Sequence, residues 1–533
     1  MTEQGKQVFV RQSTGLVRSL SFFDQFIVSQ SIIIFLNSFV LTALFAPFFF
    51  PGANLIIVFA LGAVPAFAMA AVYSILSAAL PRSGGDYVWS TRILGPFYGS
   101  IQFVFLFVTS VIGGLGLPTY YAITIALSQF SFSLGATLNN SSLINLASSF
   151  SSPGLGFPIS LVIIAAGTLI ALFGLRPFAW FQRISMMIFF AVTALFVIML
   201  VITSPSSIQS SFNHAMLISG SNTTYSGIIQ QASSSGYSGG FNLTNTLLAA
   251  IPWGFLAFTG FNYGSYLAGE TKNVKSSMTK ALFLSVIVTT IFLVLMSVLA
   301  YNDFGTTFLN AASYVQATNP SALPTMPTAT LLISLTNSVA AGIIGFGLFL
   351  GFVVVSISYI ATIARMFFAA SFDRLIPSKF ANVSDRFHSP YLSVIFIGVV
   401  WVLFTAVLWF GGFVASLLNT SLVAPIGYIL PLIAALLFYS RKRELFVRSV
   451  QSVARPATLI IASIVGIGAF ALYIFAETFP IISGMFLGAS LALAYEVVGA
   501  VLVIGIALYA IAKFRMRSLG LELSAIYEEL PPE

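Results

Sequence analysis

The chain has 533 residues, of which 58% are hydrophobic and only 7% are Asp, Glu, Lys or Arg. Soluble domains carry about 25% charged residues, so this sequence cannot cover a water-facing surface and indicates a protein embedded in lipid. The net charge is +8, but the 22 Lys and Arg lie in short clusters between apolar runs, which excludes the continuous basic face of a nucleic-acid-binding protein. The chain has no Cys and only two His, His214 and His388, both in predicted loops, so we expect neither disulfides nor a buried metal site.

The apolar runs predict about twelve membrane-spanning helices, because roughly 20 apolar residues are needed to cross a hydrocarbon core of about 30 Å. The first run follows a polar tail (residues 1–24) and has no small-residue cleavage site, so we expect a retained span and not a signal peptide. The expected spans are residues 26–46, 54–80, 98–129, 158–174, 186–203, 246–269, 278–301, 336–369, 391–410, 413–439, 457–477 and 488–512. The predicted fold class is therefore an all-α polytopic membrane protein.

The basic residues orient these spans, because Lys and Arg beside a span resist translocation and collect in the cytoplasm. With the N-terminus inside, all 22 basic residues fall in cytoplasmic segments. We therefore expect a multi-pass plasma-membrane protein with cytoplasmic N- and C-termini. The basic segments are the N-terminal tail, Arg82 with Arg92, Arg176 with Arg183, and residues 272–280, 365–386, 441–455 and 513–517.

Two predicted external loops, residues 139–157 and 205–241, are rich in Ser, Asn, Gly and Thr and contain no basic residue. They are either solvated spacers or a lid that guides substrate into the protein. Four Asn-x-Ser/Thr sequons, which matter only where the host glycosylates surface proteins, begin at Asn139, Asn140, Asn222 and Asn242.

Two spans have centres that do not favour a continuous helix. In the sixth, residues 257–265 hold two glycines and three small polar side chains among large aromatics, and each Gly costs about 1 kcal/mol against Ala in a helix. In the first, Asn37 and Ser38 can hydrogen bond to local backbone. A mid-membrane break is tolerated only where the exposed main chain faces a cavity or ligand. The alternatives are a glycine that lets a neighbouring helix approach and an interhelical hydrogen bond from Asn37.

Three motifs in this sequence resemble the amino acid–polyamine–organocation (APC) superfamily. They are LPRSGGDY at 80–87 with RILGP at 92–96, AFTGF at 257–261 with GETKN at 269–273, and ARMFFA at 364–369 with DRLIP at 373–377. They resemble the superfamily's first cytoplasmic loop, its broken sixth helix and the amphipathic segment after span 8. Each falls at the expected span number and side, and together they tie residues 80–377, more than half of the chain, into one frame.

The resemblance implies a five-plus-five inverted repeat with broken helices 1 and 6, followed by two C-terminal helices. On this frame the first repeat is residues 25–204, an external loop is 205–244, and the second repeat is 245–440. Helices 11 and 12 are residues 456–512, and a cytoplasmic tail is 513–533. The implied activity is secondary active transport of amino acids or related small amines by alternating access.

Four positions depart from the family pattern. Phe35-Leu36-Asn37 stands where the first helix usually carries Gly-x-Gly, and Asn262 stands where an acid is often found. Val274 replaces a Pro, and Arg374 replaces a Gly. These changes leave the architecture intact but make the identity of the substrate an open question.

The resemblance implies that the two breaks form the substrate site. The span centres from Phe26 to Tyr439 contain no Asp, Glu, Lys or Arg, so the site favours a ligand whose charges cancel, such as a neutral amino acid. Half-helix N-termini can receive its carboxylate, and exposed carbonyls its ammonium. Phe258 is either an aromatic gate or one packed Phe among 54. The implied substrate-binding residues are Ile34, Phe35, Leu36, Asn37, Ser38, Ala257, Phe258, Thr259, Gly260, Phe261 and Asn262.

The coupling ion is left open by the sequence, and no bound cofactor is expected. Ser356 and Ser358 on span 8 stand where sodium-coupled relatives use hydroxyls, although each can instead bond its own helix backbone. Some proton-coupled relatives place a Lys in helix 5, but none lies between Pro177 and Ser204. Na⁺, H⁺ and ion-free exchange therefore all stay open, with sodium slightly favoured.

Charged residues near the helix ends are candidates for gating or coupling. Asp24 and Glu270 can close an inner gate with Arg82, Arg365 or Lys275, although a solvated interfacial pair is the simpler interpretation. Glu496 in span 12 is a functional candidate because a charge inside the membrane is costly. For Glu496, pairing within the bundle or at an oligomer contact is favoured over proton relay.

Other function classes find less support. The sequence shows no acid–base constellation for an enzyme, no Gly-x₄-Gly-Lys-Ser/Thr loop for ATP, and no charged rings or filter repeats for a channel. A non-transporting nutrient sensor with the same fold remains the alternative to a transporter. The oligomeric state is not determined by the sequence.

Overall fold

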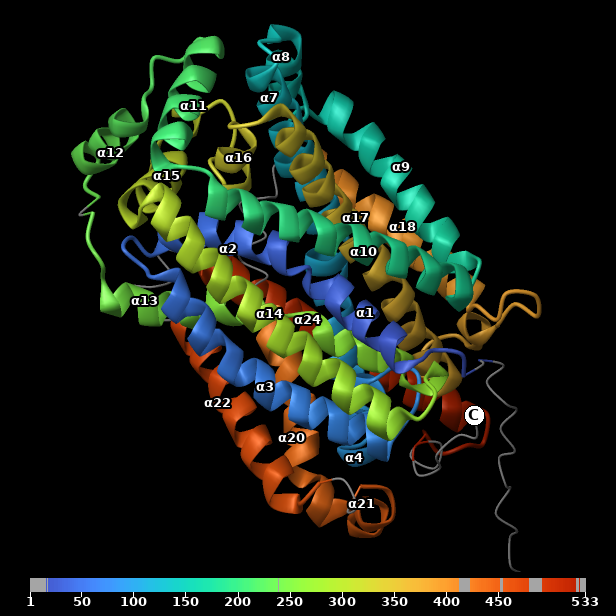
Figure 1. Ribbon diagram of the computed structural model, residues 1–533. Helices are drawn as coiled ribbons and strands as arrows, with labels where there is room; N and C mark the ends of the chain where they lie inside the picture. The colour runs from blue at the N-terminus through green and yellow to red at the C-terminus, as the bar shows by residue number, and fades with distance from the viewer. Residues whose placement is uncertain are drawn as a thin grey trace, which may run out of the picture.

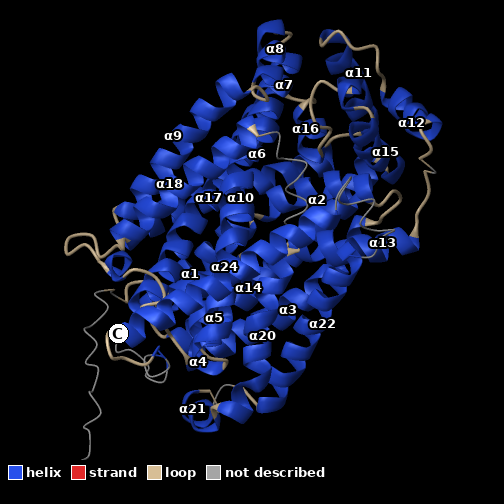
Figure 2. Ribbon diagram, turned by 180° about the vertical axis from the view of Figure 1, so that it is seen from behind, coloured by secondary structure: helices blue, strands red, loops and turns tan. Residues whose placement is uncertain are grey.

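The structure, a computed structural model, describes residue 16, residues 18–237, 239–411, 422–450, 454–478 and 491–523, and residue 527. These residues form one elongated helical bundle (Figure 1), and Figure 2 shows the same bundle from behind. At one end lie α8 (Ser141–Ser149), α11 (Pro205–Ile218) and α12 (Tyr225–Ser234), and at the other lie α4 (Asp86–Ile93) and α21 (Arg443–Ser449). We call the end with α4 and α21 the basic end, because these two helices carry Arg residues and the opposite loops carry none.

Eleven helical segments of the described chain are long and apolar enough to cross a membrane. They are α1–α2 (Phe22–Phe49), α3 (Leu55–Ala79), the segment Pro96–Thr137, α9 (Pro153–Leu172), α10 (Leu175–Ile202), α14 (Val274–Phe304), α17 (Ser338–Phe372), α18 (Tyr391–Phe410), α20 (Val423–Arg441), α22 (Pro456–Thr478) and α24 (Leu491–Ser518). The remaining expected span, the sixth in chain order, is broken into α13 (Leu243–Ala249), η3 (Ala250–Gly254) and η4 (Phe261–Glu270). The predicted polytopic all-α fold of about twelve spans is confirmed.

Polar side chains fix where several spans begin. Ser21 and Asp24 form a reciprocal capping box at the start of α1, and Asn54 accepts from the backbone N–H groups of Ile56 and Ile57 at the start of α3. Such caps satisfy N–H groups that have no partner within the helix. Local sequence thus sets the ends of these helices, while lipid-compatible side chains fill the interior.

The third span is not a uniform α-helix, although the sequence predicted one run. Its segments are α5 (Pro96–Thr109), a π-helix η1 (Ser110–Gly116), α6 (Leu117–Tyr121), a second π-helix η2 (Ala122–Leu127) and α7 (Ser128–Thr137). A Cβ atom on Gly114 would lie 2.2 Å from the ring of Tyr359 on α17, so this glycine allows the third and eighth spans to approach closely. π-Helical turns of this kind are frequent at functional sites.

The Ser- and Asn-rich external loops form packed helices and are not irregular spacers. In the longer loop, the inner faces of α11 and α12 are buried, and Phe212 and Tyr225 pack against Phe308 of α15 (Thr306–Thr318). The rings of Tyr225 and Phe308 stack with centroids 3.5 Å apart. Ile208, Phe212, Ala215 and Met216 have helical spacing, which is the signal that would have predicted α11.

Some predicted segments lie partly outside the described residues. These are the polar N-terminal tail, the beginnings of the tenth and twelfth expected spans, and parts of the C-terminal tail.

Candidate functional site

The first span breaks at Ile34, which has φ 45° and ψ 75° and separates α1 (Phe22–Ile33) from α2 (Phe35–Phe49). A β-branched residue rarely adopts this left-handed conformation, and such backbone strain is typical of functional positions. Across the break, the Ile34 N–H donates to the Gln30 carbonyl (2.9 Å), and the Ser38 hydroxyl donates to the Ile33 carbonyl (2.7 Å). The break therefore falls within the segment that the sequence indicated, and Ser38 supplies the local backbone bond expected of it.

The sixth span breaks just before Gly260. After η3 the chain turns at residues 257–260, and the 3₁₀-helix η4 then runs from Phe261 to Glu270. Gly260 has φ 110°, a conformation that residues with a Cβ atom adopt only with strain. This glycine therefore permits the turn, as the sequence predicted.

The two breaks lie against each other. A Cβ atom on Gly260 would lie 2.3 Å from Cγ2 of Ile32, and one on Gly264 would lie 2.3 Å from the Ser29 hydroxyl. Both glycines thus let η4 pack directly on α1. The structure brings the two predicted substrate-binding segments, which are more than 200 residues apart in sequence, into contact.

Burial differs among the predicted site residues. Phe258, Phe261 and Asn262 are buried, whereas Ser38 and Thr259 are partly exposed. Asn37 donates from Nδ2 to the Leu348 carbonyl of α17 (3.0 Å), which is the interhelical hydrogen bond named as the alternative for that residue. Burial of Phe258 is compatible both with a closed aromatic gate and with ordinary packing.

Several polar atoms beside the breaks are buried without a hydrogen-bond partner among the described residues. They include Ser29 Oγ and Gln25 Oε1 on α1, which both face Gly264 of η4. Buried polar groups nearly always find a partner, which is often water or a ligand. These atoms mark the α1–η4 contact as a place where water or a polar solute can bind.

The carboxylates at the basic end form ion pairs. Arg365 donates to Glu270 from Nε (3.0 Å) and from Nη2 (3.4 Å), and the two side chains are 1% and 2% exposed. The sequence favoured a solvated pair here, but the structure buries it between α17 and η4. Asp24 pairs with Arg183 of α10 at 2.6 Å, a partner that the sequence analysis did not consider.

A second buried pair holds α4 in place. Arg92 donates to Asp373 from both Nη atoms, at 2.7 and 2.8 Å, and both side chains are almost fully buried. The ring of Tyr527 in the C-terminal tail lies 5.0 Å from the Arg92 guanidinium, and the Tyr527 hydroxyl is 3.2 Å from that of Tyr87. The first basic loop is thus tied to the end of α17 and to the tail.

The sequence model of the amino acid permease family matches residues 20–509, which is nearly the whole chain. The chain belongs to the amino acid permease family. A stretch of 146 residues is also 30% identical to the branched-chain amino acid permease BcaP of Bacillus subtilis (strain 168), and this stretch covers 27% of the chain and 29% of that relative. The match makes the protein a multi-pass membrane protein of a permease family, and the aligned stretch spans less than a third of the curated relative.

The two candidate sodium ligands of this permease face different neighbours. Ser358 Oγ lies 2.9 Å from Ser31 Oγ of α1 and accepts from Gln182 Nε2 of α10 at 2.7 Å. Ser356 Oγ instead lies 3.1 Å from Thr119 Oγ1 in the third span. The structure therefore does not bring Ser356 and Ser358 together at one point, and Ser31 and Gln182 are the residues that the sequence analysis missed.

Glu496 lies near the beginning of α24, and its side chain is exposed. Among the described residues it has no ion pair within the bundle. Of the two arrangements favoured from sequence, an outward-facing contact fits this position better than pairing inside the bundle.

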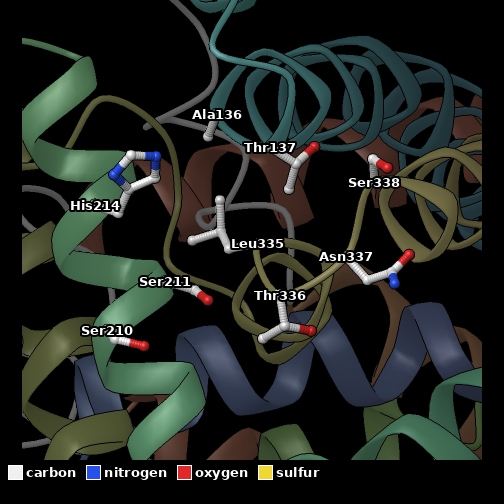
Figure 3. Close-up of a pocket in the computed structure, with 9 residues that line it drawn as sticks. All are labelled: Ala136, Thr137, Ser210, Ser211, His214, Leu335, Thr336, Asn337 and Ser338. Carbon is white, nitrogen blue, oxygen red and sulfur yellow. The ribbon is translucent and has the colours of Figure 1, made fainter.

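The permease also has a pocket of about 530 Å³ at the end opposite the basic end (Figure 3). It lies between the end of α7, the α11 helix and the residues that precede α17. His214, predicted to lie in a loop, is on α11 and lies 3.1 Å from Asn139 Oδ1. The lining residues are Ala136, Thr137, Ser210, Ser211, His214, Leu335, Thr336, Asn337 and Ser338. The pocket contains none of the predicted substrate-binding residues.

Proposed function

We propose that this permease is a secondary active transporter that moves neutral amino acids with apolar side chains across the plasma membrane by alternating access. The observation that carries the proposal is the contact of two broken helices, at Ile34 and Gly260, with no charged side chain in residues 25–49 or 243–269 around the breaks. The relative from Bacillus subtilis, named as a branched-chain amino acid permease, supports the apolar part of the substrate class.

Main-chain groups bind the zwitterion in this proposal. α2 has 15 residues, and its first N–H groups lie at the break, where the positive end of the helix dipole favours a carboxylate. Carbonyl groups freed at the turn of residues 257–260 receive the ammonium group. A cationic or anionic substrate would leave a net charge unpaired between these segments, which is costly in the membrane.

The basic end faces the cytoplasm, and both termini lie there. This orientation follows from the positive-inside rule applied to the clustered Lys and Arg. Rocking of the two repeats, residues 25–204 and 245–440, then opens the site alternately to either side. The buried Glu270–Arg365 pair and the Asp24–Arg183 pair close the cytoplasmic side.

Sodium is the proposed coupling ion, with the hydroxyls of Ser31 and Ser358 as ligands. These hydroxyls lie 2.9 Å apart at the contact between α1 and α17. Gln182 has to release Ser358 before a cation binds, because its amide N–H group points its positive end at the same oxygen. Proton coupling and ion-free exchange are the competing outcomes.

Uptake into proteoliposomes tests the proposal. Labelled leucine, isoleucine, valine, lysine and glutamate are offered while the sodium and proton gradients are varied independently. We expect saturable uptake and counterflow of the neutral amino acids, strengthened by an inward sodium gradient. A sensor would bind these compounds without counterflow.

Gly260→Leu tests the site itself. The new side chain would collide with Ile32 and strain the turn, so uptake should fall to background while expression is unchanged. Gly342→Leu is the matched control, because a Cβ atom on that span glycine meets nothing within 4 Å. Normal uptake by Gly260→Leu would contradict the site assignment.

A further inference from the structure

Asp86 is a buried carboxyl group in the first basic loop, outside the membrane-spanning segments. It begins α4 directly after Gly84 and Gly85, whose φ angles are 104° and 48° and which turn the chain inward. The Asp86 side chain is 0% exposed. The loop therefore places an acid between the second span and the broken sixth span.

Two tyrosines hold this carboxyl group. The Tyr73 hydroxyl of α3 donates to Asp86 Oδ2 at 2.8 Å, and the Tyr266 hydroxyl of η4 donates to the same oxygen at 3.3 Å. The other oxygen, Oδ1, makes no hydrogen bond among the described residues. Gly84 N–H donates to the Tyr266 carbonyl at 3.1 Å, so backbone also ties the loop to η4. Opening of the basic end at η4 has to break these contacts.

The cations near Asp86 are bonded to other acids. Arg92, on the same helix, forms two hydrogen bonds with Asp373, and Arg365 of α17 forms two with Glu270. The other titratable groups facing Asp86 are the phenols of Tyr73 on α3 and of Tyr263 and Tyr266 on η4. Among the described contacts, a negative charge on Asp86 is therefore stabilised by the Tyr73 and Tyr266 hydroxyl groups and by its own backbone N–H group.

Burial consequently raises the pKa of Asp86 from 3.8 to about 7, and the hydrogen bonds from Tyr73 and Tyr266 lower it by less. A carboxyl group hydrated by an open cytoplasmic cavity returns toward its ordinary pKa. The closed arrangement of the basic end thus binds a proton more tightly than an open one.

We propose that Asp86 is a proton-binding site that locks the cytoplasmic side of the permease: the protonated carboxyl group stabilises the loop against α3 and η4, and its deprotonation favours opening. This lock rests on the proposed function, because it acts only in a protein that opens alternately to the two sides of the membrane. Its test requires no substrate. The lock slows inward opening when the cytoplasm is acidic.

The sign of the pH dependence follows from linkage. Because the pKa is higher in the closed state, closure is favoured most at low pH and loses its advantage as the pH rises toward 7. One proton changes the ratio of open to closed protein by up to about tenfold per pH unit between the two pKa values. Above pH 7 the ratio should level off, because both states are then deprotonated.

The absence of Cys from the natural chain allows a single-thiol reporter. Ser29 is 0% exposed and faces Gly264, so the thiol of Ser29→Cys reacts with a membrane-impermeant maleimide only when α1 and η4 separate. Labelling rates of the purified full-length protein are measured from pH 5 to pH 8. The same rates in the Asp86→Asn background correct for ionisation of the thiol itself.

The labelling rate with Asp86 intact is divided by the rate in the Asp86→Asn background. We expect this ratio to rise by up to about tenfold per pH unit up to pH 7 and then to level off. Tyr73→Phe, with Asp86 intact, should raise the pH at which this ratio levels off, because it removes the closer hydrogen bond to the carboxylate. Asp385→Asn, which changes an exposed acid at the basic end, should leave that pH unchanged.

A ratio independent of pH, or a Tyr73→Phe profile that matches the unmodified reporter, would overturn the lock. Either result would leave the transport proposal untouched, because the labelling experiment contains no substrate. Conversely, failure to transport amino acids would overturn the proposed function even with the expected pH profile.

Discussion

Arg365 and Glu270 show that burial decides how much an ion pair contributes to the free energy of unfolding. Their pair is bidentate and almost fully buried, whereas Arg183, which pairs with Asp24, is 48% exposed. Removing one member of a buried pair leaves a charge without a partner in a low-dielectric interior. An exposed guanidinium, in contrast, exchanges its partner for water at little cost.

Arg365→Met should therefore lower the free energy of unfolding by roughly 3–5 kcal/mol. Arg183→Met, the comparison, should lower it by less, because the buried Asp24 carboxylate keeps its hydrogen bonds from the Ser21 N–H and hydroxyl groups. Chemical unfolding of the detergent-solubilised variants measures both. The double variant Arg365→Met with Glu270→Leu should regain much of the loss, since no buried charge is then left alone. Equal losses from the two single Arg variants would show that burial does not govern these pairs.

Among the elements, the external helices α11 and α12 depend on a small aromatic contact. Phe212 and Tyr225 pack on Phe308, and no membrane supports this part of the chain if it lies in water as proposed. Composition alone indicated either a solvated spacer or a lid that guides substrate, and neither prediction included packed helices. Its order comes from a few apolar side chains at helical spacing that find a common partner on α15.

Phe308→Ala should weaken the packing by about 3–5 kcal/mol and release α11 and α12 locally, without unfolding the spans. Limited proteolysis should then cut between residues 219 and 224 faster than in the unmodified protein. Leu217→Ala is the control, because Leu217 lies on α11 but is 69% exposed. Unchanged protection in Phe308→Ala would mean that other contacts hold the two helices.

For the whole molecule, orientation in the membrane follows from the distribution of charge. The described basic loops lie at the end of the bundle with α4 and α21, and the loops with α8, α11 and α12 at the other end contain no Lys or Arg. The proposed orientation places the second set outside the cell.

Single-thiol variants of the Cys-free chain test this orientation. In intact cells, Ser226→Cys on α12 should react with a membrane-impermeant maleimide, and Asp385→Cys in the loop after α17 should react only after permeabilisation. Both positions are exposed, so a difference reports their side of the membrane. The reverse pattern would invert the topology and place the Asp86 lock on the outside.

The sequence by itself predicted about twelve spans and their order, and it marked the first and sixth as candidates for a break while leaving packed helices as the alternative. These are local properties: an apolar run long enough to cross lipid, a Gly at 260 that weakens a helix, and Ser38, whose hydroxyl bonds the Ile33 carbonyl beside the break. Tertiary structure decided which residues meet. Asp24 pairs with Arg183, 159 residues away, and Asp86 is buried beneath Tyr73 and Tyr266. Burial and ion pairing arise between segments distant in the chain, so they depend on how the helices pack and leave no mark in the local sequence.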